Sequence, residues 1–191
     1  MKVSREQVAA NRQKILESAA RLFKARGFDA VTVADVMQAA GLTHGGFYGY
    51  FKSKDDLIAH TLAQIFAADP AELDLARYAE SYLSMRHCQN VADGCPVAAL
   101  GCETSRQTAE ARAAMTTGLR QHLERLSAGA RGRTTADKRR AAIGSWAAMV
   151  GAMIMARYSD DPKLSEELLA QTRAWIVSVW RRPMVSRHPP G

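Results

Sequence analysis

Residues 32–50 read TVADVMQAAGLTHGGFYGY, and this stretch decides the fold of the N-terminal part of the chain. Thr32, followed three residues later by Asp35, predicts the start of a helix, because the two residues can cap each other's backbone N–H groups. Gly41 predicts the end of that helix, and Thr43 predicts the start of a second, short one. A helix, a tight turn and a second helix are typical of a helix-turn-helix, which places its second helix in the major groove of DNA.

The apolar residues of this stretch lie on one side of both predicted helices. Val36 and Met37 form the inner face of the first helix, while Phe47 and Phe51, four residues apart, point inward from the second. The outward positions carry short polar or aromatic polar groups: Thr43, His44, Gly45, Tyr48 and Tyr50. Such groups suit contacts with phosphate oxygens and base edges. The same spacing also fits a helical hairpin inside an enzyme or an adaptor.

Outward from this stretch, apolar residues recur at helical spacing and no strand-like alternation persists. We expect an all-α protein of about nine helices, one of them over residues 71–87. Residues 1–52 are expected to form a compact three-helix unit that binds DNA, and residues 53–191 a larger helical body.

Composition restricts the class of protein. The chain has 191 residues, of which 47% are hydrophobic, and a formal net charge of +7, which suits a polyanionic partner without identifying one. Its three cysteines argue against a secreted disulfide scaffold and predict a cytoplasmic protein. The uncharged run 141–156 would rise about 24 Å as a helix, short of the roughly 30 Å of a bilayer core, so we expect no membrane span.

No catalytic motif stands out. A phosphate-binding P-loop, a GxGxxG turn, a GxSxG elbow and an HExxH helix are all missing, so we expect neither an enzyme nor a cofactor. The histidines and cysteines lack the paired short spacing of zinc sites, so no metal is expected. Two alternatives stay open: a cysteine-dependent all-α enzyme using Cys95 with His87 or His122, and a helical adaptor dimer that does not bind DNA. Steeply salt-dependent DNA binding would separate the DNA-binding interpretation from both.

Residues 15–58, ILESAARLFKARGFDAVTVADVMQAAGLTHGGFYGYFKSKDDLI, resemble the N-terminal domain of the TetR family of bacterial transcriptional regulators. The most specific part of the match is the run of Phe47, Tyr48, Phe51, Lys54 and Leu57. The resemblance implies that the third helix reads the major groove and that Tyr48 and Lys54 contact phosphate. Thr32 and Thr43 resemble further DNA contacts of the family, and His44 either contacts DNA or faces solvent.

The resemblance also implies a homodimer that binds a palindromic DNA operator, usually as a repressor, and pairs its last two helices with those of a second copy. Gly144, Ala148, Ala152 and Ala156 form a ridge of small residues at a spacing of four, which would let helices pack closely. Apolar residues of the last helix complete the expected interface: Leu168, Trp175, Ile176 and Val179.

Members of the family usually bind a small-molecule effector in the helical body. Candidate lining residues are Phe66, Tyr78, Tyr82, Met85, Met115, Leu119, Trp146 and Met149. Each of them equally suits an ordinary hydrophobic core, and methionine-rich walls do not specify a ligand.

The segment 94–103, GCPVAALGCE, suggests a second mode of regulation. If Pro96 opens a helix, Cys95 is its N-cap, where thiols ionise and react more readily. The segment resembles a branch of the family with a Gly-Cys loop, some of whose members sense electrophiles or oxidants, so Cys95, Cys88 and Cys102 are candidate sensor thiols. The alternative is that all three are small buried hydrophobic residues. The test compares DNA release on alkylation between the native protein and a Cys95→Ser variant. If release is the same in both, sensing by Cys95 is ruled out.

Overall fold

The computed structural model describes residues 4–67 and 74–181, with side chains up to residue 178. Over these residues the chain forms nine α-helices and one 3₁₀ helix and no strand, which confirms the predicted all-α fold. The helices are α1 (Arg5–Arg26), α2 (Val33–Ala39), η1 (His44–Gly49), α3 (Lys54–Ala67), α4 (Leu75–Tyr82), α5 (Met85–Gln89), α6 (Pro96–Thr104), α7 (Ala109–Ala128), α8 (Thr135–Tyr158) and α9 (Pro162–Arg181).

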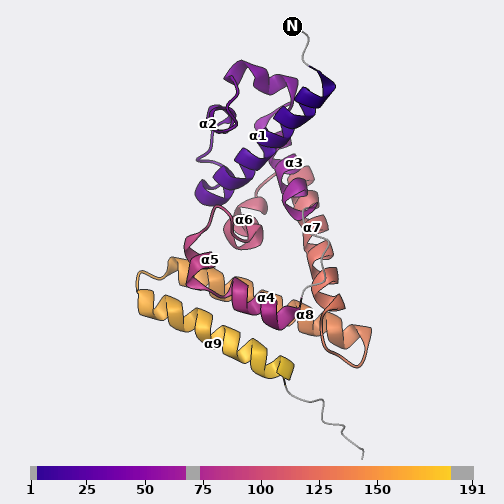
Figure 1. The fold of residues 1–191 in the computed structure, drawn as a ribbon, viewed down its shortest axis with the longest axis vertical. Helices are drawn as coiled ribbons and strands as arrows, with labels where there is room; N and C mark the ends of the chain where they lie inside the picture. Colours follow the sequence, from indigo (N-terminus) through magenta and orange to yellow (C-terminus); the bar gives the residue numbers. More distant parts are fainter. Residues whose placement is uncertain (1–3, 68–73, 182–191) are drawn as a thin grey trace, which may run out of the picture.

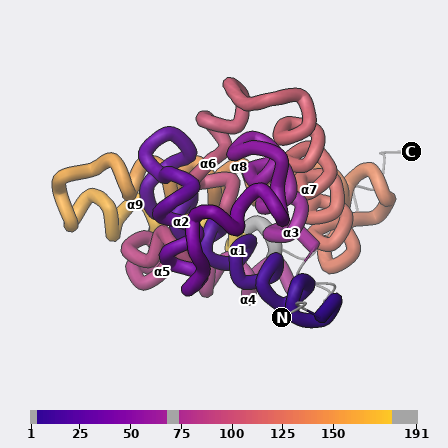
Figure 2. Tube along the Cα trace, turned by 90° about the horizontal axis from the view of Figure 1, so that it is seen from above, coloured from indigo at the N-terminus to yellow at the C-terminus, as the bar shows by residue number. Residues whose placement is uncertain are grey.

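The helices form two groups joined by a middle layer (Figure 1). α1 and α2 lie at one end, and α8 and α9 lie side by side at the other end together with α4 and α5. α6 and α7 connect the two groups, since α7 packs along α3 above and α8 below. Seen from above, the N-terminal helices lie over the body, with α7 to one side (Figure 2).

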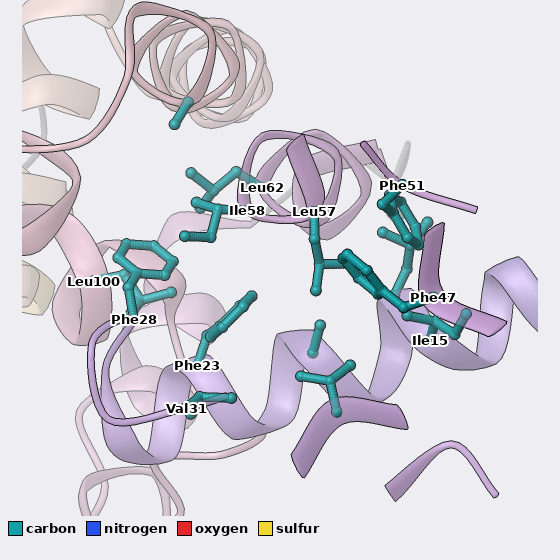
Figure 3. Close-up of a cluster of buried hydrophobic side chains, with 14 of the residues drawn as sticks. Ile15, Phe23, Phe28, Val31, Phe47, Phe51, Leu57, Ile58, Leu62 and Leu100 are labelled. Carbon is teal, nitrogen blue, oxygen red and sulfur yellow. The ribbon is translucent and has the colours of Figure 1, made fainter. Parts of the chain in front are cut away.

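The N-terminal group is built around an aromatic and aliphatic core (Figure 3). α1 turns its Ile15 and Phe23 face toward α3, as the helical spacing of its apolar residues requires. Phe47 and Phe51 stack with ring centroids 5.8 Å apart. This core continues past residue 52 into α3 and includes Leu100 of α6, so the domain boundary stays a prediction.

Local capping starts the helices where the sequence predicts. The Ser4 hydroxyl accepts the N–H of Gln7 at the start of α1. Thr32 and Asp35 cap α2 reciprocally, and the hydrogen bonds that Asp35 accepts from Thr32 lower the pKa of its carboxyl. Gly27 ends α1 with φ +81°, a left-handed conformation that glycine adopts without strain.

The single helix predicted over residues 71–87 is wrong in its second half. α4 ends at Tyr82 and α5 begins at Met85, because the Ser84 hydroxyl accepts the N–H of His87 and starts a new helix. Leu83 between them is non-helical and buried in the core of the body. Residues 71–73 lie outside the described part of the chain.

The body has a second core, which overturns part of the expected dimer interface. Ala152, Ala156 and Ile176 are at most 4% exposed and lie within this core, because other helices of the same chain, above all α9, pack against α8. Of the other expected interface residues, Gly144 and Trp175 are exposed and Ala148 and Leu168 are half-buried, whereas the Val179 side chain lies outside the described residues.

The uncharged run 141–156 lies within α8. None of the helices in the described ranges is long and apolar enough to cross a membrane.

Candidate nucleic-acid interface and its connection to the body

The second helix of the helix-turn-helix is η1, a 3₁₀ helix with distinct inner and outer faces. Phe47 is completely buried, whereas the next residue, Tyr48, is 73% exposed. Thr43, His44 and Gly45 are also exposed. Thr43 occupies the N-cap position, but its hydroxyl makes no capping hydrogen bond, contrary to the expectation from sequence. Four of the predicted DNA contacts therefore share one surface, and the contact itself stays a prediction.

Tyr50 and Lys54, the two other predicted DNA contacts near η1, are half-buried. The Tyr50 hydroxyl accepts a hydrogen bond of 3.0 Å from Asn11 Nδ2, which braces the end of η1 against α1. Lys54 opens α3 and is half-buried. The Arg12 guanidinium lies over the Phe51 ring, 5.0 Å from its centroid, which places a cation of α1 next to the motif. Sequence reasoning missed Asn11 and Arg12, because no local pattern links them to residues about forty positions away.

The three glycines of η1 are not required by packing within the chain. A Cβ at Gly45 or Gly49 would meet nothing within 4 Å, and one at Gly46 would come no closer than 3.7 Å to Thr43 Oγ1. Glycine weakens a helix by about 1 kcal/mol relative to alanine. The flat backbone of η1 is therefore suited to close approach by a partner surface.

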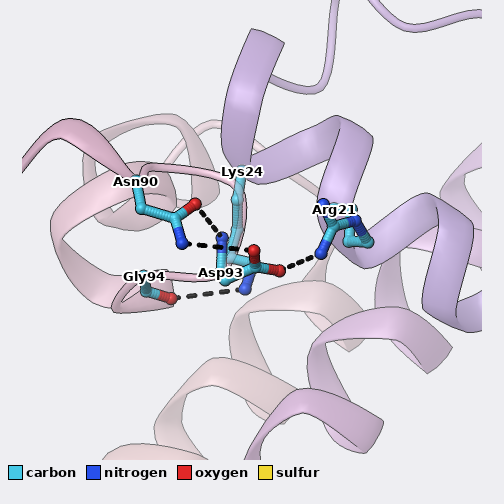
Figure 4. A network of polar contacts seen from close by, with 5 residues as sticks. All are labelled: Arg21, Lys24, Asn90, Asp93 and Gly94. Carbon is cyan, nitrogen blue, oxygen red and sulfur yellow. Dashed lines mark hydrogen bonds and ion pairs between the residues drawn. The ribbon is translucent and has the colours of Figure 1, made fainter. Parts of the chain in front are cut away.

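Polar contacts tie α1 to the loop before α6 (Figure 4). Arg21 forms an ion pair with Asp93, and Lys24 Nζ donates a 3.3 Å hydrogen bond to the Gly94 carbonyl. The side-chain amide of Asn90 holds Asp93 from the other side, since its Nδ2 donates to the Asp93 carboxylate and its Oδ1 accepts the N–H of Asp93. Burial lowers the pKa of Lys24, which Asp93 partly opposes.

Glu103 of α6 makes a second connection to the N-terminal group. Its carboxylate accepts the N–H of Phe28 at 2.7 Å, just past the end of α1. Gly27 is required for its backbone conformation, and a Cβ there would lie 2.6 Å from Glu103 Oε1, so a larger residue would also displace this carboxylate. The sequence gives no indication of this role, since the two segments are 75 residues apart.

The loop that holds α1 also borders a cavity of 260 Å³. Its lining residues are Tyr78, Ser81, Tyr82, His87, Asp93, Gly94 and Cys95. His87 Nδ1 lies 2.7 Å from the Tyr82 carbonyl and must donate to it, while His87 Nε2 accepts the N–H of Cys95 at 3.0 Å. Burial lowers the pKa of His87, which favours this neutral ring. Occupancy of the cavity would act on the same loop that α1 grips.

The three cysteines are free thiols in different environments. Cys95 is the N-cap of α6, as predicted, and half-buried, whereas Cys88 is buried and Cys102 is exposed. Within the described residues, no three His, Cys, Asp or Glu side chains gather as a metal site would require.

The residues predicted to line an effector pocket do not gather around one space. Phe66 and Met115 belong to the core of the N-terminal group, whereas Tyr82, Trp146 and Met149 belong to the core of the body. Leu119 packs against both cores, while Tyr78 and Met85 pack against the second. Only Tyr78 and Tyr82 of this set line the 260 Å³ cavity.

The chain thus has the architecture of a helix-turn-helix protein, namely an all-helical body with an N-terminal helix-turn-helix whose outer face is polar. Residues 15–61 match the model of the family described as "Bacterial regulatory proteins, tetR family". The N-terminal domain is thus similar to that of this family, which confirms the resemblance seen in the sequence.

Two curated relatives match less than a third of the chain. The chain is 39% identical over 56 residues to the HTH-type transcriptional repressor KstR2 of Mycolicibacterium smegmatis, which covers 29% of this chain and 27% of that protein. It is 41% identical over 56 residues to the HTH-type transcriptional repressor Rv1474c of Mycobacterium tuberculosis, covering 29% and 30%. The chain thus matches under a third of the length of these relatives.

Solved structures extend the likeness of fold to the body. The reduced form of NemR from E. coli superposes with a TM-score of 0.74 at 22% identity, over 92% of this chain and all of that one. A TetR-family regulator from Cytophaga hutchinsonii gives 0.70 at 19% identity, over 96% and 100%. At these identities the likeness concerns the fold.

Proposed function

We propose that the protein is a homodimeric regulator of transcription in the cytoplasm that binds a palindromic DNA operator through η1. The observation that carries this proposal is the outer face of η1, where Tyr48 stands 73% exposed directly beside the buried Phe47. Relatives of the N-terminal domain named as transcriptional repressors support repression as the mode of action.

Operator binding tests this proposal. We expect Tyr48→Ala and Lys54→Ala each to weaken binding to the DNA upstream of the protein's own gene by roughly tenfold, because each removes one phosphate contact. Lys54→Ala should also lower the slope of log affinity against log salt by about 1. The measurement is fluorescence anisotropy over a series of salt concentrations.

Lys163→Ala is the matched control, since Lys163 is an exposed cation of α9 at the other end of the molecule. If this DNA is not bound, selection of bound fragments from the whole genome supplies the test sequence. Salt-independent binding, or variants that bind like the native protein, would contradict the proposal.

We infer that the dimer forms through the outer face of α8 and α9, which keeps Gly144 and Trp175 of the interface expected from sequence but not the buried Ala152, Ala156 and Ile176. Large apolar side chains stand exposed along these helices: Ile143, Met155, Tyr158, Leu164 and Trp175. On the same helix α8, a Cβ at Gly144 or Gly151 would meet nothing within 4 Å, so a partner helix could come close there. Two-fold pairing would present the two η1 helices to successive major grooves.

Trp175→Glu is expected to shift the protein from dimer to monomer in light scattering, because a carboxylate would lose water at the centre of the interface. DNA binding should weaken with it, since one η1 alone reads half a palindrome. Tyr48→Ala, a change in η1, which packs against α2, serves as the control and should stay dimeric. A dimeric Trp175→Glu protein would refute this interface.

Release from DNA would run through the loop at residues 90–95. Asp93 and Gly94 line the cavity and also hold Arg21 and Lys24 of α1, so an effector that moves the loop would shift the scaffold helix of the DNA-binding unit. A thiol-reactive compound on Cys95 would act on the same loop. This alternative depends on the predicted membership of the chain in the Gly-Cys branch of the family.

A further inference from the structure

A group of buried polar side chains between α4, α7 and α8 has unused hydrogen-bonding capacity. Four buried atoms in it have no hydrogen-bond partner: Tyr82 Oη, His122 Nε2, Arg125 Nε and Trp146 Nε1. Tyr82 is 4% and Trp146 7% exposed. Leaving a buried polar group unsatisfied costs about 1–3 kcal/mol, so four neighbouring ones call for a physical reason.

The four side chains belong to one continuous aromatic cluster. The ring centroids of His122 and Trp146 are 4.4 Å apart, and those of His122 and Tyr78 are 5.7 Å apart. Tyr78 in turn lies 5.5 Å from Tyr82. Arg125 joins the cluster one turn along α7 from His122, with its Nη2 3.5 Å from His122 Nδ1.

Every unpartnered atom in this cluster is a hydrogen-bond donor. Because Arg125 can only donate, His122 Nδ1 accepts from it, which places the proton of the neutral ring on Nε2. Burial and the Arg125 charge lower the pKa of His122 to about 4, so this ring is neutral at pH 7. Burial raises the pKa of Tyr82, which keeps its hydroxyl protonated. Trp146 has an N–H and no acceptor.

The charge of Arg125 has no acidic partner. No ion pair among the described residues involves it, and its charge lowers both the pKa of His122 and, against the larger effect of burial, the pKa of Tyr78. A guanidinium surrounded by N–H and O–H donors and aromatic faces is complementary to a carboxylate, which accepts two hydrogen bonds from arginine in its own plane.

We infer that this donor cluster recognises the effector and that the effector is a planar aromatic carboxylate. The carboxylate would accept hydrogen bonds from Arg125 Nε and Trp146 Nε1, and its ring would lie against the aromatic faces of the cluster. Tyr78 and Tyr82 also line the 260 Å³ cavity, which adjoins the cluster without being lined by Arg125 or Trp146. The cavity is small by comparison with drug-sized sites, so a compound of one or two rings would reach the two donors past these tyrosines. Naming this compound the effector rests on the function proposed above; the binding itself does not.

Calorimetric titration of the full-length protein at pH 7.5 tests the inference. The probes are benzoate and 2-naphthoate, with benzamide and 2-naphthamide as neutral isosteres and cyclohexanecarboxylate as a non-planar acid. We expect at least one of the two aromatic carboxylates to bind, and to bind at least tenfold more tightly than its amide and than cyclohexanecarboxylate.

Variants locate the site. Arg125→Gln should weaken carboxylate binding at least tenfold, and Trp146→Phe, which keeps an aromatic ring but removes the N–H, should weaken it several-fold. Arg120→Gln, an exposed arginine on the same helix, should bind like the native protein. Thermal melts confirm that each variant is folded, and Arg125→Lys replaces Arg125→Gln if the latter does not fold.

Binding of the amides as tightly as the acids, equal binding by Trp146→Phe and the native protein, or no binding of either aromatic acid would overturn the inference. DNA binding is measured separately on the same preparations. Intact operator binding without carboxylate binding would remove this inference alone, whereas carboxylate binding by a protein that binds no DNA would remove the proposed function and leave the site.

Discussion

Phe47→Ala is expected to destabilise the protein by about 3–5 kcal/mol and to abolish DNA binding. Phe47 is completely buried, stacks on Phe51 and anchors the inner face of η1. Its removal leaves a cavity between η1 and α1 that the helices can only partly fill. η1 has three glycines and 3₁₀ hydrogen bonding, and Phe47 is its one buried residue, so this side chain is its main apolar anchor beside the hydrogen bond between Asn11 and Tyr50 at its end. Urea denaturation followed by circular dichroism measures the loss of stability.

Two comparisons make this prediction specific. Phe47→Leu keeps most of the buried volume and should cost less than about 1.5 kcal/mol. Tyr48→Ala, one residue away on the exposed side, should leave the free energy of unfolding unchanged within about 0.5 kcal/mol while weakening DNA binding. If the free energy of unfolding of Phe47→Ala is less than about 1 kcal/mol below that of the native protein, or if this variant binds DNA normally, other contacts hold η1 in place.

Gly118→Ala is the second large effect, expected to destabilise the protein by about 1–3 kcal/mol. Gly118 lies on α7 where it packs along α3, and a Cβ there would overlap three atoms of the Phe66 ring. Phe66 is 7% exposed and cannot swing into solvent without leaving the core. The direction of the change in stability is informative, because alanine would otherwise stabilise a helix by about 1 kcal/mol relative to glycine.

Gly101→Ala is the matched control in α6, where the nearest side-chain atom would be Val97 Cγ1 at an ordinary 3.7 Å. It should be neutral or stabilising by up to about 1 kcal/mol. Combining Gly118→Ala with Phe66→Leu should recover part of the lost stability, since a smaller side chain frees the space. Thermal unfolding of the native protein, Gly118→Ala, Gly101→Ala and the double variant compares their stabilities. Equal stability of Gly118→Ala and the native protein would contradict the close packing of α3 on α7.

The limits of sequence reasoning are clearest along α8. The uncharged run 141–156 predicts a helix, and the small residues at a spacing of four are expected to form a packing ridge. The prediction that a second subunit packs on this ridge was wrong for Ala152 and Ala156, which face the core of their own subunit. Met155 and Tyr158 are exposed instead. A helix that is apolar on several sides does not itself indicate which side another helix of the same chain covers.

The sequence by itself determined the helix-turn-helix, the helix starts at Thr32 and Pro96, and the exposed position of Tyr48 beside the buried Phe47. Capping bonds join residues three or four apart, and helical periodicity is read within a single segment, so these features need no knowledge of the rest of the fold. Only the tertiary structure decided the rest: the grip of the 90–94 loop on α1, the support of η1 by Asn11, and the meeting of donors from α4, α7 and α8. These contacts join segments tens of residues apart, and their geometry depends on how whole helices pack rather than on any local pattern.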